Sequence, residues 1–162
     1  MADALAYSID EAGFGHIRFN RPEIHNAFDN TLIESLSAAI EALRSDARVR
    51  AVVIAAEGAS FCAGGDLAWM LRMGQAPEPE NVADALKLAR VLNALATLPK
   101  PTLALVQGPA YGGGVGVVAA CDIAIAAPEA RFALTEVRLG ILPAVISPYV
   151  VAAIGARAAA RY

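Results

Sequence analysis

One stretch of the sequence constrains the fold more than any other, the run PTLALVQGPAYGGGVGVVAAC from Pro101 to Cys121. Its apolar first part predicts a buried strand, and the three glycines at 112–114 predict a turn that opens a helix. Backbone N–H groups at a helix start have no partner within the helix and lie at the positive end of its dipole. Because glycines leave these groups uncovered, the turn is suited to bind an oxygen that carries negative charge.

Composition limits the classes of protein to consider. A chain of 162 residues that is 57% hydrophobic and 18% charged is most simply one globular domain, 1–162. A net charge of −3 gives no basic surface for nucleic acid. Cys62 and Cys121 are too few for a disulfide framework or a zinc site. With no secretory signal and a glycine-interrupted apolar run, we expect a cytoplasmic protein without a metal site or a membrane span.

Strands and helices are predicted to alternate, which indicates an α/β fold with mostly parallel strands. Strands are expected at 4–9, 16–19, 49–55, 102–107 and 123–126, with a short one near Phe132. Helices are expected from Asp29 or Asn30, from Asn81, at the glycine run and from about Ser147. The first two strands are expected to form a hairpin.

The two long helices are predicted to be amphipathic. The apolar face of the first comprises Leu32, Ile33, Leu36, Ile40 and Leu43. The apolar face of the second, which ends before Pro99, comprises Val82, Ala85, Leu86, Ala89, Leu92 and Leu95. Residues 74–80 contain Pro77 and Pro79 and are predicted to form a mobile connection.

Known phosphate-binding patterns do not fit the glycine run. The dinucleotide fingerprint fails because Val117 stands where its last glycine belongs, and no Gly-Lys-Ser/Thr follows. A second glycine turn, FCAGGD at 61–66, follows another strand. Two such strand-end loops could converge on one oxygen and form an oxyanion hole. The alternative is that Gly64 and Gly65 simply make a tight turn.

Taken together, these motifs resemble the enoyl-CoA hydratase/isomerase (crotonase) family over almost the whole chain. The matching segments are FNRPEIHNAFD, AVVIAAEGASFCAGGDL, KPTLALVQGPAYGGGVGVVAACDIAIAA and FALTEVRLGILPA. The resemblance implies the α/β ClpP/crotonase-like fold, a spiral of ββα units. It also implies that 1–162 is the N-terminal spiral domain and that the family's C-terminal helical region is largely missing.

The resemblance assigns roles to particular residues. The family's two carbonyl-binding N–H groups fall on Gly65 and Gly113, and its proton-transferring acid falls on Glu136. The positions expected to bind substrate and coenzyme A are Ala27, Ala63, Gly65, Asp66, Leu67 and Gly113. Coenzyme A would enter as part of the substrate, with no covalently bound cofactor. Trp69, Met70 and Met73 could line an acyl pocket or pack in the core.

The chain departs from the family pattern at Gly116. Hydratases of the family usually carry a second glutamate there, in a GGG-x-E pattern, to activate water. The loss of that glutamate favours a double-bond isomerase that uses one acid. By contrast, the block PAVISPYVVAAIG resembles bacterial members that act on branched glutaconyl-type acyl-CoA esters, which favours hydration.

The sequence therefore predicts an enoyl-CoA hydratase, with an enoyl-CoA isomerase as the alternative enzyme. Negative charge that develops on the thioester oxygen would be stabilised by the two N–H groups while the carboxylate moves the α-proton. A homo-oligomer, trimer or hexamer, is expected from the resemblance. A non-catalytic coenzyme A-binding or assembly protein is the alternative outside the enzymes.

Overall fold

The structure is a computed structural model that describes residues 4–161. Its helices and strands are, in chain order, β1 (Leu5–Ile9), β2 (Phe14–Phe19), the 3₁₀ helix η1 (Pro22–Ile24), α1 (Asn30–Ser45), β3 (Ala51–Ala56), α2 (Leu67–Gln75), α3 (Glu78–Ala96), β4 (Thr102–Val106), β5 (Ala110–Tyr111), α4 (Gly113–Ala120), β6 (Ile123–Ala126), β7 (Phe132–Ala133), the 3₁₀ helix η2 (Glu136–Leu139), α5 (Ser147–Ile154) and α6 (Ala156–Ala159).

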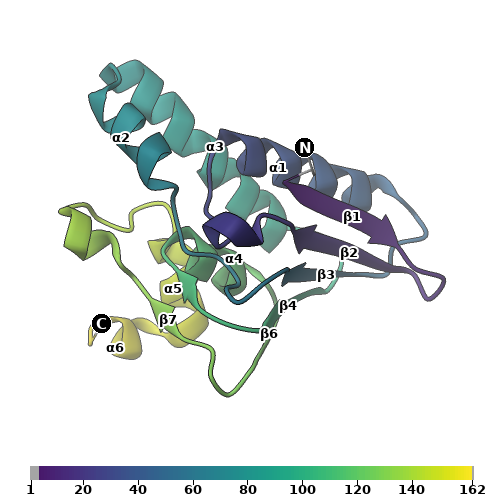
Figure 1. Cartoon of the computed structure of the whole chain (residues 1–162). Coiled ribbons are helices and arrows are strands. Elements are labelled where there is room, and N and C mark those ends of the chain that lie inside the picture. The colour runs from purple at the N-terminus through teal and green to yellow at the C-terminus, as the bar shows by residue number, and fades with distance from the viewer. Residues whose placement is uncertain (1–3, 162) are drawn as a thin grey trace.

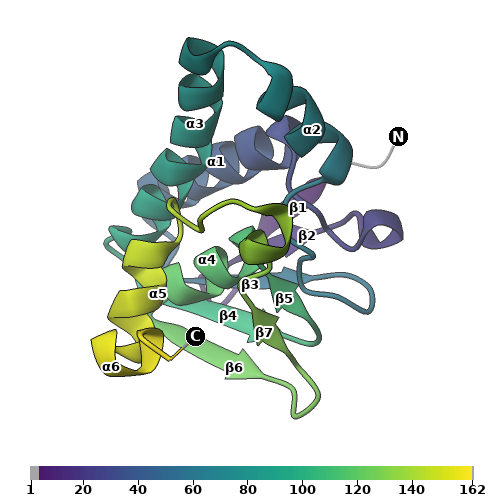
Figure 2. The same ribbon diagram turned by 90° about the vertical axis from the view of Figure 1, so that its left-hand side faces the viewer.

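Two sheets organise these elements. The larger has the strand order β1-β2-β3-β4-β6, and the smaller pairs β5 with β7 (Figures 1 and 2). β1 and β2 form an antiparallel hairpin, whereas every other pairing in the two sheets is parallel. The expected α/β organisation and the expected hairpin are both confirmed. Helices α1 and α3 cover one face of the larger sheet (Figure 1).

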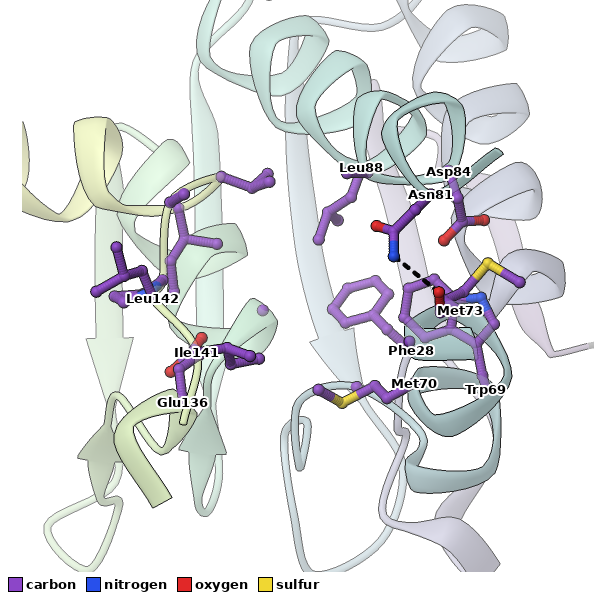
Figure 3. Close-up of a pocket in the computed structure, with 18 residues that line it drawn as sticks. Phe28, Trp69, Met70, Met73, Asn81, Asp84, Leu88, Glu136, Ile141 and Leu142 are labelled. Carbon is purple, nitrogen blue, oxygen red and sulfur yellow. Dashed lines mark hydrogen bonds between the residues drawn. The ribbon is translucent and has the colours of Figure 1, made fainter. Parts of the chain in front are cut away.

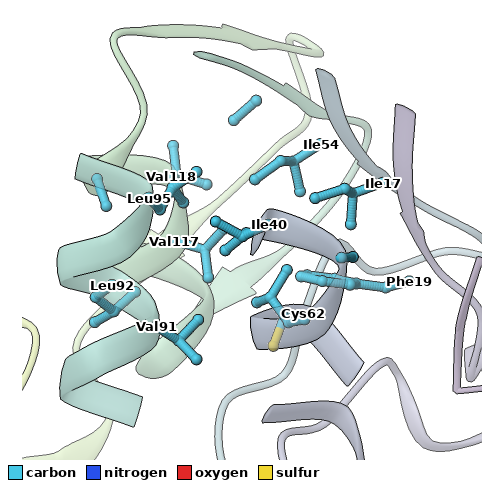
Figure 4. Close-up of a cluster of buried hydrophobic side chains, with 14 of the residues drawn as sticks. Ile17, Phe19, Ile40, Ile54, Cys62, Val91, Leu92, Leu95, Val117 and Val118 are labelled. Carbon is cyan, nitrogen blue, oxygen red and sulfur yellow. The ribbon is translucent and has the colours of Figure 1, made fainter. Parts of the chain in front are cut away.

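The core lies between the larger sheet and α1, α3 and α4 (Figure 4). Helix α1 is capped by Asp29, whose side chain accepts a hydrogen bond from the Leu32 N–H at 2.9 Å. All five residues predicted for its apolar face are buried, because a stripe at i, i+3, i+4 and i+7 faces a single neighbour. Helix α1 therefore has the orientation that its sequence predicts.

Helix α3 differs from its prediction. It begins at Glu78, and only Ala76 and Pro77 separate it from α2, so residues 74–80 are not the mobile connection that was expected. Pro79 is tolerated because the first turn of a helix needs no N–H partner. Val82 and Leu86 are 52% and 44% exposed, since the start of α3 extends beyond the sheet with α2 (Figure 1).

The larger sheet ends at β6, an edge strand on which all four residues are exposed. Asp122, just before β6, accepts hydrogen bonds from the backbone N–H and the hydroxyl of Thr102 at 2.8 and 2.9 Å. This contact fixes the start of β6 beside the start of β4. In the described part of the chain, no helix is both long enough and apolar enough to cross a membrane.

Candidate active site

The glycine run forms the N-terminal turn of α4. Gly112 adopts a φ of 48°, a left-handed conformation that disfavours a side chain, and its N–H donates to the Ala133 oxygen at 3.0 Å. Gly114 packs so closely on Cys62 that an added Cβ would lie 2.8 Å from the Cys62 Cβ. Gly113 lies between them, and its N–H has no acceptor among residues 4–161. The turn thus leaves one helix-start donor free.

The second glycine turn is held against the segment that precedes α1. The Phe28 N–H donates to the Gly64 oxygen at 2.7 Å, and the Phe28 oxygen accepts from the Asp66 N–H at 2.7 Å. Gly64 has a φ of 93°, so this turn also requires a glycine. The Gly65 N–H, which lies between these two bonds, finds no acceptor within the described residues.

The two turns meet, as the sequence suggests they could. A Cβ added to Gly112 would lie 3.7 Å from the Gly64 Cα, and one added to Gly113 would lie 3.1 Å from the Phe28 ring. Gly65 and Gly113 both line one cavity of about 420 Å³. Phe28 and Met70 line the same cavity (Figure 3). Two free backbone donors from distant parts of the chain therefore share a single cavity.

Glu136 lines the same cavity, on the side opposite Phe28 and Met70 (Figure 3). It is the first residue of η2, and its Oε1 would lie 3.2 Å from a Cβ built on Gly112. Its Oε2 is buried and has no hydrogen-bond partner among residues 4–161. A carboxylate oxygen without a partner is therefore available next to the glycine turn that carries the Gly113 donor.

The other residues predicted to bind substrate differ in their hydrogen bonds and in their exposure to solvent. The Ala63 N–H donates to the His25 oxygen at 2.9 Å, which holds the second glycine turn against the Ala27 segment. Asp66 caps α2 by accepting from the Trp69 N–H at 2.8 Å. Leu67 is 70% exposed beside that cap, whereas Ala27 is only 6% exposed. A ligand could thus contact the Leu67 side chain, whereas Ala27 offers it almost no accessible surface.

Trp69, Met70 and Met73 of α2 all line the cavity, which agrees with the acyl-pocket alternative for these residues. Trp69 also belongs to the buried core, so the two expected roles coincide in one residue. The apolar side chains on this wall give the cavity a surface suited to a hydrocarbon chain.

Gly116 packs closely against neighbouring side chains. It is buried in α4, and a Cβ built there would collide with the Ile146 side chain and lie 3.3 Å from Leu92 Cδ1. Ile146 is 3% exposed and also lines the cavity. The volume next to Gly116 is therefore filled by an apolar residue.

Sequence reasoning missed Asn26, which positions the second glycine turn. Its side chain is fully buried, and its amide nitrogen donates to the Glu57 and Ser60 oxygens at 2.9 Å each. Its Oδ1 accepts from the Arg21 N–H at 2.8 Å. Asn26 has a φ of 55°, a conformation that asparagine tolerates better than most residues. The sequence signal that could have identified this role is the position of Asn26 within FNRPEIHNAFD, one of the segments that resemble the family.

Neither cysteine chemistry nor metal chemistry is supported in the described residues. Burial raises the pKa of the Cys62 thiol to about 12, so it carries almost no thiolate at neutral pH. No group of three or more His, Cys, Asp or Glu side chains among residues 4–161 is placed to hold a metal ion.

Comparison with known proteins gives the family. The family model described as Enoyl-CoA hydratase/isomerase matches residues 10–162. The chain belongs to the enoyl-CoA hydratase/isomerase family. A crystal structure of an enoyl-CoA hydratase from Shewanella pealeana superposes with a TM-score of 0.95 at 42% identity, over 98% of this chain and 60% of that one. The crotonase fold expected from the sequence is thereby confirmed.

Two curated relatives are similar to most of the chain. A Thermus thermophilus protein that is provisionally named an enoyl-CoA hydratase is 40% identical over 90% of this chain and 58% of its own length. The human mitochondrial methylglutaconyl-CoA hydratase is 38% identical over 83% of this chain and 39% of its own length. The chain thus spans about half the length of these two relatives of the enoyl-CoA hydratase/isomerase family.

Proposed function

We propose that this chain binds an unsaturated acyl-CoA thioester, stabilises its enolate and hydrates its double bond. The observation that carries the proposal is the shared cavity. Two backbone N–H groups without acceptors, at Gly65 and Gly113, line it together with a carboxylate oxygen of Glu136 that has no partner. Membership of the enoyl-CoA hydratase/isomerase family supports the same reading.

The proposed chemistry assigns one task to each group. The thioester oxygen accepts hydrogen bonds from the Gly65 and Gly113 N–H groups, which stabilise the negative charge that develops on it. The Glu136 carboxylate accepts a proton from water while the water oxygen bonds to the β-carbon. The resulting carboxylic acid returns a proton to the α-carbon, so that enoyl-CoA and water give a 3-hydroxyacyl-CoA.

Double-bond isomerisation is the second candidate, and one observation favours it. Position 116 carries a glycine packed against Ile146 and Leu92, so it supplies no second carboxylate. A single carboxylate suffices to remove a proton from one carbon of an acyl chain and return it to another. The same two N–H donors would stabilise the dienolate formed between these steps.

The proposal extends to the acyl group, the coenzyme A site and the assembly. A branched glutaconyl-type acyl group is suggested by the similarity to the human methylglutaconyl-CoA hydratase. Coenzyme A would lie along Ala63, Asp66, Leu67 and the Ala27 segment. A trimeric or hexameric assembly and a cytoplasmic location follow from the resemblance to the family and from the sequence alone.

The role of Glu136 is tested by Glu136→Gln, which keeps the size of the side chain but removes its basicity. We expect turnover of enoyl-CoA substrates to fall by about 10²–10⁴-fold, because a positioned acid–base group contributes that much. The measurements are hydration of 2-enoyl-CoA and the double-bond shift of 3-enoyl-CoA, followed by separation of the products. The first reaction identifies a hydratase and the second an isomerase.

A matched control is Glu129→Gln, a carboxylate in the exposed loop before β7 that lines no part of the cavity. It should retain wild-type turnover. Equal turnover by wild type and Glu136→Gln would refute the proposed role of Glu136. Binding of acyl-CoA without turnover of either kind would instead indicate the non-catalytic alternative.

A further inference from the structure

Strand β6 leaves one side of its backbone unpaired at the border of the larger sheet (Figure 2). It pairs in parallel with β4, and no strand among residues 4–161 lies on its other side. The Ala127 N–H donates to the Val106 oxygen of β4 at 2.9 Å. Because backbone groups alternate in direction along a strand, the N–H and C=O groups of Ala124 and Ala126 point away from β4.

The side chains of β6 are exposed on both faces of the sheet. Ile123 and Ile125, which lie on one face, are 49% and 55% exposed. Ala124 and Ala126 lie on the face that carries the buried Ala104 of β4, yet they are exposed as well. No element among residues 4–161 therefore overhangs this edge, and a further strand has room to approach it.

The sequence of β6 does nothing to oppose pairing with a further strand. Residues 123–127 read IAIAA and contain neither a charge nor a proline, the devices by which edge strands commonly prevent association. The nearest carboxylate, on Asp122, is held by hydrogen bonds from Thr102 of its own chain at 2.8 and 2.9 Å. Leu105 of β4, the register partner of Ile125, is 39% exposed and extends the apolar face of the edge.

We propose that β6 pairs with β6 of a second copy of this chain, antiparallel and across a two-fold axis at Ile125. In that register, Ala124 lies opposite Ala126 of the partner subunit. Each such pair exchanges two hydrogen bonds, so every outward N–H and C=O group of Ala124 and Ala126 finds a partner in both copies. The ladder ends at Pro128, which has no N–H to donate.

The match of the strand to itself is what favours a second copy as the occupant. Ile125 faces the partner's Ile125 directly, so the apolar face formed with Leu105 continues across the axis, and no like charges lie opposite each other within residues 123–127. A two-fold contact can join two trimers into a hexamer, which agrees with the hexameric assembly proposed above. The pairing does not depend on the proposed chemistry, because it involves no residue of the cavity.

Cysteine cross-linking tests the register, and it captures the pair even when association is weak. Ile125→Cys would place two thiols on Cα atoms about 4.5 Å apart, which is within the range of a disulfide. Mild oxidation should convert most of this variant to a covalent dimer on a non-reducing gel. Wild type measures the background from Cys62 and Cys121.

Ile123→Cys is the matched control, because it lies in the same strand and on the same face. In the proposed register it lies about 13 Å along the strand from its counterpart in the partner subunit, so it should not cross-link. The double variant Ile123→Cys with Ala127→Cys should cross-link, because these two positions lie opposite each other. Equal cross-linking of Ile123→Cys and Ile125→Cys would overturn the register, and no cross-link at Ile125→Cys would overturn the pairing.

Ala124→Pro tests the backbone hydrogen bonds without an added thiol. A symmetric dimer would lose two hydrogen bonds, so its dissociation constant in sedimentation equilibrium should rise about tenfold. The urea midpoint should stay near that of wild type, because the Ala124 N–H points away from β4 and an edge strand tolerates proline there. A dissociation constant equal to that of wild type, or a wild-type chain that stays monomeric, would contradict the proposal.

Discussion

At the scale of single residues, a side chain at position 116 would have to displace Ile146. The Ile146 side chain occupies the space into which any side chain at 116 would project. We expect Gly116→Ala to destabilise the fold by about 1–3 kcal/mol through overpacking, measured by urea unfolding. Gly116→Glu should be worse, because it also places a carboxylate beside Leu92 in an apolar interior.

The control for this prediction is a double-mutant cycle with Ile146→Ala. If Ile146 is the obstacle, the cost of Gly116→Ala should become smaller when Ile146 is truncated, and the two changes should not be additive. Additive costs would mean that something other than the contact with Ile146 limits position 116.

The sequence predicted the roles of some site residues but not the contacts that others make. The sequence indicated that two strand-end glycine turns could converge on one oxygen. The family resemblance then assigned the two donors to Gly65 and Gly113. By contrast, nothing in the sequence reveals that Glu136 Oε2 has no hydrogen-bond partner among residues 4–161, or that Ile146 fills the space beside Gly116. Those facts depend on which side chains the packing of α2, α3 and the chain before α5 brings together.

At the scale of elements, Asn26 connects the segment before α1 to the loop after β3. Its side chain makes three hydrogen bonds to the backbone of these two segments. We expect Asn26→Ala to lower the free energy of unfolding by about 2–3 kcal/mol, because the Arg21 N–H and the Glu57 oxygen lose the hydrogen bonds that the buried Asn26 side chain makes to them. Affinity for acyl-CoA should fall too, since this link positions the turn that carries Gly65.

Asn26→Asp is the sharper variant, because it directs a carboxylate at two carbonyl oxygens. It should be at least as destabilising as Asn26→Ala. Glu23→Ala, an exposed change in the same segment, should stay within about 0.5 kcal/mol of wild type in urea unfolding. An Asn26→Ala variant of wild-type stability would contradict the proposed linking role.

The apolar face was predicted correctly for helix α1 but only in part for helix α3. The stripe of α1 was predicted correctly because the whole helix packs on the sheet and on α3. The stripe of α3 was predicted only in part, since its second half packs in the core while its first half lines the cavity with α2. A periodic pattern tells which residues share a face, but it does not tell what that face contacts.

At the scale of the whole molecule, the C-terminal half of the structure exposes several large apolar side chains. Ile123 and Ile125 of β6 and Phe132 of β7 are about half exposed, and Leu142 is 83% exposed. Apolar surface of this kind promotes association when it is contiguous. We expect the chain to self-associate in a concentration-dependent manner, measured by sedimentation velocity.

The variant Ile125→Lys tests this expectation, because it places a charge on an exposed edge strand where lysine opposes pairing. It should shift the distribution towards monomer with little change in the urea midpoint. Arg131→Glu, which alters charge in the exposed loop beside β7 without removing apolar surface, serves as the control. A wild-type chain that sediments as a single monomeric species at all concentrations would contradict the prediction.

The free donors at Gly65 and Gly113 have one more consequence. Both belong to the main chain, so a scan that replaces side chains one at a time would leave their hydrogen-bonding capacity intact and register only the steric effect of the added atoms. Replacing the amide linkage that contains either N–H with an ester, by semisynthesis, would delete the donor and retain the local shape. The stabilisation of the thioester oxygen proposed for this cavity is thus encoded in the path of the backbone, whereas the proposed proton transfer depends on the Glu136 side chain.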